Sequence, residues 1–302
     1  MARRILVTGG TGQIGLELRQ VRWPAGIEVC FPSRAQLDLA SPDSIATYMA
    51  QGGFACVINT AAWTAVDAAE DNVADCFLAN ALGPAWLAEQ AHRMGAAMIH
   101  ISTDYVFDGA LDRPYREDDP VNPVSAYGAS KLAGELAVRS ANPRSVILRV
   151  AWVLSRHRAN FLKTMLRLGA ERSELGVVSD QRGCPTAAAD IAAAIQTIGL
   201  SQLDDELSPS GLYHFVNAGE ASWYELAQAI FAMAAERGFP APVVNAITTA
   251  QFPTRAHRPA NSRLDTAKLQ RDFAIDPSPW RDGVQEIVSQ MLADKPLQGG
   301  EA

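Results

Sequence analysis

Three glycines near the N-terminus constrain the fold of this chain more than any other feature. Gly9, Gly12 and Gly15 follow the apolar run 5–7 and open a stretch with helical periodicity from residue 12 to about residue 21. Glycine is required where a backbone turns sharply from a strand into a helix and where it must approach a pyrophosphate. The spacing therefore predicts a strand–loop–helix unit that binds a dinucleotide, with a glycine-rich turn lacking a ligand as the alternative. The residues expected to contact the cofactor from this loop are Gly9, Thr11, Gly12, Gln13, Ile14 and Gly15.

Short apolar runs alternate with helical stretches through the first half of the chain. Strands are predicted over 5–7, 28–31, 55–58, 98–101 and 145–150, and helices over 12–21, from 42 onward with Ser41 as N-cap, over 75–93 and over 127–140. Such alternation is typical of a parallel sheet covered by helices on both faces. We predict an α/β, Rossmann-like doubly wound fold, with residues 1–150 as the dinucleotide-binding domain.

The alternation of predicted strands and helices becomes less regular after residue 150. We predict helices over 160–170, 187–198 and 222–237, a short strand at 177–178, a loop over 203–210, and an extended segment with four prolines over 240–259. Residues 151–302 are expected to form mainly a smaller, interwoven substrate-binding lobe, with some segments returning to the Rossmann sheet. The tail from Lys295 onward is expected to be disordered.

Charge and apolar content narrow the classes of function. The formal net charge of -7 at pH 7 argues against a nonspecific nucleic-acid binder, which needs a basic face. No apolar run approaches the roughly 20 residues that span a bilayer, and the N-terminal run ends at Thr8, too early for a signal peptide. The four cysteines are scattered without paired spacing, which favours a reducing compartment. We therefore expect a cytoplasmic protein with no nucleic-acid or membrane partner.

The segment after the second strand bears on the choice of cofactor. An acid there would bind the ribose 2′-hydroxyl of NAD, but residues 31–34 contain none. Ser33 and Arg34 are suited to a 2′-phosphate, which favours NADPH and leaves acceptance of NADH open. An Arg34 that is merely exposed is the alternative. Asp38 and Leu39, further on, are expected to flank the adenine.

Two other strands end in polar or small residues at the carboxyl edge of the predicted sheet, where open α/β sheets place ligands. Asn59, Ala61 and Ala62 follow the third strand, and the small alanines would let a ribose or nicotinamide pass closely. Thr103 follows the fourth strand, and its hydroxyl is suited to hydrogen-bond a substrate carbonyl.

Tyr127 and Lys131 are four residues apart and therefore lie on one face of a helix. A free tyrosine has a pKa of about 10 and is a poor acid or base at neutrality, but an adjacent ammonium stabilises the phenolate. The same lysine can reach the hydroxyls of a cofactor ribose. Spacing of this kind also occurs by chance in exposed helices. Combined with Thr103 at a strand end, it predicts a proton-transfer site.

These motifs resemble the extended short-chain dehydrogenase/reductase superfamily, and within it the dTDP-4-dehydrorhamnose reductase family. The similar segments are 9–15, 59–70, 102–107, 127–135, 160–161, 180–186 and 258–264. The resemblance implies that NADPH delivers hydride to C4 of dTDP-4-dehydro-β-L-rhamnose, with Tyr127 as proton donor and Thr103 and Lys131 assisting. The residues that it implies for contact with the nucleotide sugar are Thr64, Val66, Thr103, Asp104, Val106, Trp152, Asn160, Arg258, Asn261, Ser262 and Arg263.

The chain departs from the family pattern in two places. Ala151 and Leu154 stand where the family often has a hydroxyl and a tyrosine, which leaves part of the pocket polarity open. Some members form homodimers through Mg²⁺ held by carboxylates, and here only Asp190 is suitably placed. We assign no metal ligand, and both Mg²⁺ and a homodimer stay open.

Two other classes of protein share these motifs. A sugar-nucleotide 4-epimerase, or a reductase of another 4-keto sugar nucleotide, would have the same fold and the same Thr, Tyr and Lys. An epimerase retains NAD tightly, which favours the acid that residues 31–34 lack. A noncatalytic NADP-binding protein, like the regulatory subunits of methionine adenosyltransferase, is free to lose Thr103, Tyr127 and Lys131, yet all three are present.

Overall fold

The computed structural model describes residues 2–293, and a six-stranded sheet lies at its centre. The strand order is β10-β5-β4-β3-β1-β2, and every neighbouring pair is parallel. The strands are β1 (Arg3–Thr8), β2 (Ile27–Cys30), β3 (Phe54–Asn59), β4 (Ala97–Thr103), β5 (Ser145–Val150) and β10 (Gly211–His214). The predicted α/β doubly wound fold is confirmed.

Helices cover both faces of this sheet because side chains alternate along each strand. Ile5 and Val7 of β1 pack into a core with helices α1, α8 and α10, whereas Leu6 packs into a second core with α2, α5 and α6. These helices are α1 (Gln13–Leu18), α2 (Pro42–Gly52), α5 (Gly83–Arg93), α6 (Ala126–Ala141), α8 (Ala188–Asp204) and α10 (Ala267–Phe273). Both α8 and β10 come from beyond residue 150, so the second half of the chain contributes to the sheet.

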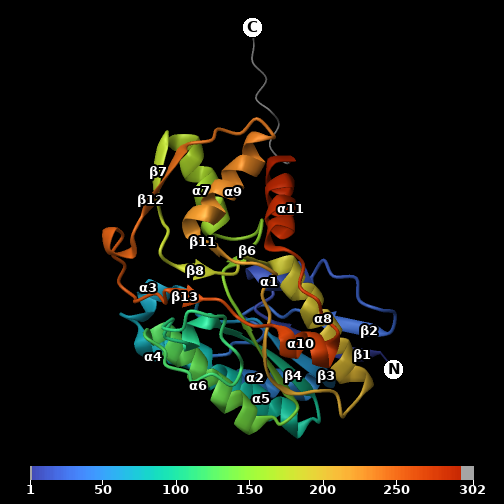
Figure 1. Ribbon diagram of the computed structural model, residues 1–302. Coiled ribbons are helices and arrows are strands. Elements are labelled where there is room, and N and C mark those ends of the chain that lie inside the picture. The colour runs from blue at the N-terminus through green and yellow to red at the C-terminus, as the bar shows by residue number, and fades with distance from the viewer. Residues whose placement is uncertain (1, 294–302) are drawn as a thin grey trace.

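The remaining elements form a second layer beyond the carboxyl ends of the strands, at the top of Figure 1. Three helices and a two-stranded sheet enclose an apolar core of their own, and two further small sheets, one of two strands and one of three, complete this layer. Its elements are α7 (Phe161–Glu171), α9 (Trp223–Ala235), α11 (Trp280–Ala293), β7 (Glu174–Val178), β12 (Val243–Ile247), β6 (Val153–Leu154), β9 (Thr186–Ala187), β8 (Arg182–Gly183), β11 (Ala221–Ser222) and β13 (Asn261–Ser262).

Local signals place the helix starts correctly. The Ser41 hydroxyl accepts a hydrogen bond from the Ser44 amide, which makes it the N-cap of α2 as predicted. Ser222 caps α9 and forms a capping box with Glu225. These short-range interactions need no tertiary context, which is why the sequence reveals them.

The helix predicted over 75–93 is wrong in one respect, because it is interrupted. A short helix, α4 (Val73–Phe77), leads into a π-helical turn over Leu78–Leu82 before α5 begins. Pro84 in the first turn of α5 has no N–H, so an ordinary α-helical bond to the Asn80 carbonyl is not available there. Asn80 instead directs its side chain at the loop after β3, where its Oδ1 accepts from the Trp63 amide at 2.8 Å.

Several boundaries in the second half also differ from prediction. Helix α8 continues to Asp204, beyond the predicted end at 198, and the segment 240–259 contains β12 and a 3₁₀ turn, Thr249–Gln251. No element is predicted after residue 259, although Trp280, Val284, Ile287 and Val288 follow helical spacing and are buried in α11. The tail predicted from Lys295 lies outside the described residues. Among residues 2–293, no helix combines the length and the apolar character that crossing a bilayer requires.

Candidate active site

Two adjoining cavities lie at the carboxyl edge of the sheet, on either side of the glycine loop. The first has a volume of about 500 Å³ and the second of about 530 Å³, and both are lined by Gly9, Thr11, Ala61 and Ala62. The chain leaves β1 toward β2 on one side and reaches β3 on the other. A reversal of strand order of this kind opens a crevice at the strand ends, where dinucleotides bind in such folds.

The glycine loop is shaped for close approach. Gly9 has φ +72°, and a Cβ added there would lie 2.5 Å from the Ala61 amide nitrogen. A Cβ at Gly15 would collide with the Gly9 carbonyl oxygen, across the turn from loop to helix. Side chains at these two positions would therefore force the loop apart. The loop and the two cavities beside it fit an extended dinucleotide.

The second cavity collects the residues predicted for the adenosine end of the cofactor. Ser33, Arg34, Asp38 and Leu39 all line it. The Arg34 side chain is 84% exposed, and its Nε lies 3.5 Å from Asp38 Oδ1. A guanidinium that is this exposed and has only one long contact with a carboxylate can pair with a phosphate of a ligand.

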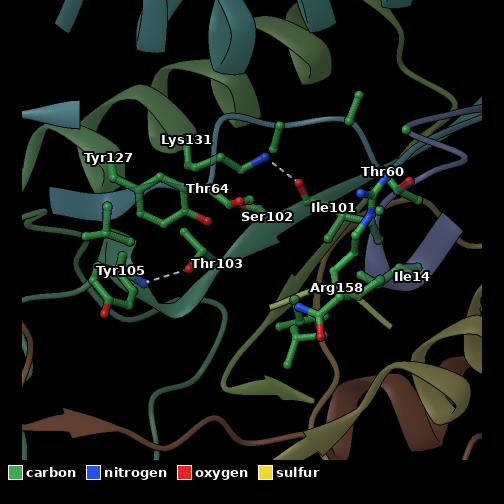
Figure 2. Close-up of a pocket in the computed structure, with 18 of the residues that line it drawn as sticks. Ile14, Thr60, Thr64, Ile101, Ser102, Thr103, Tyr105, Tyr127, Lys131 and Arg158 are labelled. Carbon is green, nitrogen blue, oxygen red and sulfur yellow. Dashed lines mark hydrogen bonds between the residues drawn. The ribbon is translucent and has the colours of Figure 1, made fainter. Parts of the chain in front are cut away.

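The first cavity brings Tyr127 and Lys131 together from successive turns of α6 (Figure 2). Ser125 caps this helix by accepting from the Gly128 amide. Tyr127 is 9% exposed and Lys131 is 2% exposed. Lys131 Nζ donates to the Ile101 carbonyl at 2.6 Å, which ties α6 to the end of β4.

Burial controls the acidity of both groups. It raises the pKa of the Tyr127 phenol, and the neighbouring Thr103 hydroxyl opposes that rise. Burial lowers the pKa of Lys131 to about 8, whereas the negative charge of Glu135 acts in the opposite direction. A phenol that holds its proton beside an amine that titrates near neutrality is an arrangement suited to proton donation.

Asp104 contributes a buried carboxylate to the wall of the same cavity. Its Oδ1 accepts from Thr103 Oγ1 at 3.0 Å, while its buried Oδ2 has no hydrogen-bond partner in the described part of the chain. Burial raises the pKa of Asp104 to about 6, and the nearby Ser262 side chain lowers it. An unpaired acceptor of this kind is costly unless a ligand supplies a donor, so it fits a hydroxylated substrate.

Trp152 lines the cavity in a left-handed conformation, with φ 47°. Its ring stacks on Trp223 at 3.5 Å between centroids, and the Trp223 Nε1 donates to Gln181. A Cβ at Gly183 would collide with the Trp152 ring. The left-handed backbone of Trp152 and the packing of its ring against Trp223 and Gly183 therefore hold this side chain in the cavity wall.

The structure places six of the residues implied for substrate contact away from the cavity walls, each packed among protein groups. Val106 is buried in a core cluster, Asn160 caps α7 and donates to Gln13, Arg258 pairs with Asp67, Asn261 donates to the Leu111 and Arg113 carbonyls, Ser262 is buried in β13, and Arg263 pairs with Glu220. Asn59 also lies beneath the loop and not in a cavity wall. Substrate contact through these six side chains stays a prediction.

Other wall residues are not identified by the sequence analysis. They are Thr60, Ile101, Ser102, Tyr105, Val150, Val153, Arg158 and Ala159. Most of them lie at or next to the carboxyl ends of β3, β4 and β5, and that position alone predicts a place in the ligand-binding crevice. Arg158 gave no such signal because it lies in a loop, where it adopts φ 56° and its Nε donates to the Thr11 carbonyl at 2.6 Å. Figure 2 shows its side chain extending along the cavity.

Asp190, the carboxylate considered for Mg²⁺, has a protein partner instead. Its Oδ2 accepts from Asn217 Nδ2 at 2.6 Å. Across residues 2–293, no group of three or more His, Cys, Asp or Glu side chains is arranged to hold a metal ion.

Comparison with known proteins agrees with this geometry. A family model described as the RmlD substrate binding domain matches residues 3–293. The chain is 42% identical over 300 residues to a dTDP-4-dehydrorhamnose reductase of Sinorhizobium fredii, covering 99% of this chain and 100% of that one. The chain belongs to the dTDP-4-dehydrorhamnose reductase family. The family resemblance inferred from the motifs is thereby confirmed.

Solved structures of the dTDP-4-dehydrorhamnose reductase family share the whole architecture. One from Clostridium acetobutylicum superposes with a TM-score of 0.89 at 35% identity, covering 95% of this chain and 99% of that one. Another, from Bacillus anthracis in complex with NADP, gives a TM-score of 0.88 at 32% identity, covering 96% and 100%. The two cavities at the strand ends therefore belong to a fold that extends over the full length of these family members.

Proposed function

We propose that this protein is a dTDP-4-dehydrorhamnose reductase, which uses NADPH to convert dTDP-4-dehydro-β-L-rhamnose into dTDP-L-rhamnose. The observation that carries the proposal is that Tyr127, Lys131 and Thr103 line the same cavity as the glycine loop. The names of the relatives support the choice of substrate. Bound NADPH would supply the hydride that reaches C4 of the sugar.

The side chains around the first cavity suit the second half of that reduction. Thr103 would turn its hydroxyl proton from Asp104 to the ketone oxygen and so orient that oxygen toward the phenol. As negative charge develops on that oxygen, Tyr127 would donate its proton to it, and its raised pKa keeps that proton in place at neutrality. Lys131 would hold the cofactor ribose and restore the proton on Tyr127.

Each of the two cavities would bind a different part of the cofactor. Residues 1–150 would form the dinucleotide-binding domain, with the glycine loop against the pyrophosphate and Ser33 and Arg34 against the 2′-phosphate. Asp38 and Leu39 would flank the adenine. The NADP complex of the Bacillus anthracis relative supports this assignment. The absence of an acid in residues 31–34 gives no support to a 4-epimerase, which retains NAD.

Arg34→Ala is expected to weaken binding of NADPH roughly tenfold, because an exposed charge-assisted contact contributes on the order of 1.4 kcal/mol. Binding of NADH, which has no 2′-phosphate, should change less than twofold. Titration of both cofactors by fluorescence or calorimetry measures the two dissociation constants. Arg22→Ala, which lies on the same domain outside both cavities, is the control. An equal loss for NADPH and NADH would remove Arg34 from the 2′-phosphate site.

Asp104→Asn is expected to stabilise the protein at pH 8 while weakening substrate binding. The pKa of the buried carboxyl, about 6, exceeds its ordinary value of 3.8. Folding therefore favours the protonated form, and stability falls as the pH rises through the interval between these values. A shift of roughly two units corresponds to about 3 kcal/mol above that interval. The amide keeps an oxygen for Thr103 and carries no charge.

Urea unfolding of the wild type and of Asp104→Asn at pH 8 and at about pH 4 tests this expectation. The stability difference should be largest at pH 8 and should shrink at the lower pH. The KM for the nucleotide sugar should rise because a charged acceptor for its hydroxyl is lost. A stability difference that does not vary with pH would show that Asp104 does not carry the buried charge.

The direct test of the proposed function is oxidation of NADPH with dTDP-4-keto-6-deoxy-L-lyxo-hexose, generated in situ by the upstream dehydratase and epimerase. We expect one equivalent of NADPH to be consumed for each equivalent of dTDP-L-rhamnose formed, as separated by anion-exchange chromatography. Consumption at the rate of a protein-free control would refute the assignment. Retention of tightly bound NAD through gel filtration, with interconversion of two sugar epimers, would identify an epimerase.

A further inference from the structure

His100 contacts Lys131 but lines neither of the two cavities, and the mechanism proposed above gives it no role. It belongs to β4 and is completely buried. Its Nδ1 lies 2.9 Å from Asn59 Nδ2, and its Nε2 lies 3.5 Å from Lys131 Nζ. The ring therefore bridges a buried amide at the end of β3 and the lysine on α6.

The orientation of the Asn59 amide determines which nitrogen of His100 carries the proton. Asn59 Oδ1 accepts from Thr8 Oγ1 at 2.6 Å and from the Ala61 amide at 3.2 Å. Because the oxygen is occupied by these two donors, the Nδ2–H of Asn59 points at His100 Nδ1, which must accept. Burial holds the pKa of His100 well below its usual value, so the ring is neutral. Its single proton is therefore on Nε2.

The Nε2–H of His100 consequently faces Lys131 Nζ. An ammonium group has three donors and no lone pair, so it cannot accept this hydrogen bond, whereas a neutral amine can. The other partner of Nζ, the Ile101 carbonyl, accepts from either form. The contact with His100 therefore favours the amine over the ammonium.

The negatively charged groups around Lys131 do not fully offset this preference for the neutral amine. The nearest carboxylate, Glu135 on the same helix, accepts two hydrogen bonds from Arg149, at 2.8 and 2.7 Å, and a third from Ser102 at 2.5 Å. Cys76 on α4 acts on Lys131 in the same direction as Glu135, toward the charged form. Because Arg149 already neutralises Glu135, Lys131 has no ion-pair partner of its own within residues 2–293.

We propose that His100 is a positioning residue for the reaction, which acts through Lys131 by donating its Nε2–H to the neutral amine. In each turnover Tyr127 gives its proton to the substrate oxygen and becomes a phenolate. The Lys131 ammonium then releases a proton that restores the phenol, and the amine left behind is stabilised by His100 until it takes a proton from solvent. This inference rests on the proposed function for its catalytic consequence, but not for the state of Lys131.

His100→Phe tests the inference because it keeps a ring of similar size and removes the donor. The chain has only four lysines, Lys131, Lys163, Lys268 and Lys295, so lysine-selective isotope labelling gives few NMR signals to assign. In the cofactor-free wild type, the Lys131 side chain should titrate near its pKa of about 8. In His100→Phe the midpoint should rise by about one unit, the size expected for loss of one hydrogen bond. The signal of Lys163, which lies on α7, serves as the internal control.

His100→Gln separates this effect from simple loss of packing, since its amide can still donate toward Lys131. We expect its Lys131 midpoint to lie closer to the wild type than that of His100→Phe, so it also keeps the question answerable if the phenylalanine variant does not fold. A purely structural role would lower kcat at every pH without moving the midpoint. Equal midpoints in wild type and in a folded His100→Phe would overturn the proposal, and so would a His100→Gln midpoint that is raised by the full unit although the donor is kept. The titration uses no cofactor or substrate, so its outcome is independent of the reductase assay.

If the reductase assay succeeds, the pH dependence of kcat provides a second readout. The limb that reports loss of the Lys131 proton should move to higher pH in His100→Phe, by about the same one unit as the NMR midpoint. A shift in the NMR midpoint without a shift in this limb would show that His100 sets the state of Lys131 without influencing turnover, and would overturn the catalytic half of the proposal.

Discussion

Tyr127→Phe is expected to lower kcat by about 10²–10⁴-fold while leaving the affinity for NADPH nearly unchanged. The substitution removes only the phenolic oxygen, which is the group proposed to donate the proton. The ring is retained, and with it the edge-to-face contact with Tyr105 at 5.5 Å between centroids. Steady-state kinetics and a separate binding titration measure the two quantities independently.

Tyr105→Phe is the matched control for this variant, because Tyr105 lines the same cavity and is half-buried. If any tyrosine hydroxyl in the cavity affected turnover through polarity alone, the two variants would lose similar activity. We expect Tyr105→Phe to stay within about tenfold of the wild type, the scale of one peripheral hydrogen bond. Full activity in Tyr127→Phe would remove the phenol from the mechanism.

The parts of the fold that depend on local patterns are those that the sequence predicts well. Five of the six strands of the large sheet are predicted, because a short apolar run bounded by turn residues is a local signal. The sixth, β10, consists of only four residues after a proline-containing loop. Its place beside β5 depends on pairing across more than sixty positions of the chain, and no local pattern reports such pairing.

The residues of the candidate site also fall into those with a local sequence signal and those that depend on long-range contacts. Gly9, Tyr127 and Thr103 are predicted to lie at the cleft because they follow strands or share a helix face. His100 and Arg149 give no comparable signal, since a single polar residue in an apolar strand looks the same whether it is functional or structural. Their importance depends on side chains from other elements, which only the folded arrangement brings within hydrogen-bond distance.

Loop residues are the other group that sequence reasoning could not place. Arg158 lies in a segment without periodicity, and its contact with the glycine loop spans 147 positions. Arg263 and Asn261 show a different limit of the sequence. Family resemblance implies that they contact the nucleotide, which stays a prediction, and in the structure their side chains also bind the Arg113 carbonyl and the Glu220 carboxylate. Sequence similarity reports which residues a family keeps, but it does not separate contact with ligand from support of the wall.

The buried ion pair of Arg149 and Glu135 is expected to produce the largest stability effect in the molecule. The two side chains are only 2% and 3% exposed, and Phe107 packs over the guanidinium at 4.9 Å. Arg149→Met leaves the Glu135 carboxylate buried without its counterion. We expect the free energy of unfolding to fall by about 3–5 kcal/mol, as measured by urea denaturation. Arg93→Met, which breaks the exposed pair with Glu89, should change it by less than about 1 kcal/mol.

The double variant Arg149→Met with Glu135→Leu separates the stability of the pair from its use in the site. Replacing a buried pair by apolar side chains of similar volume is often neutral, so most of the stability lost in Arg149→Met should return. Its activity should stay below that of the wild type, because Ser102 in the cavity wall loses its acceptor. The pH profile should change little, because the positive charge of Arg149 is removed together with the negative charge of Glu135. A double variant that recovers both wild-type stability and wild-type activity would show that the pair serves the fold alone.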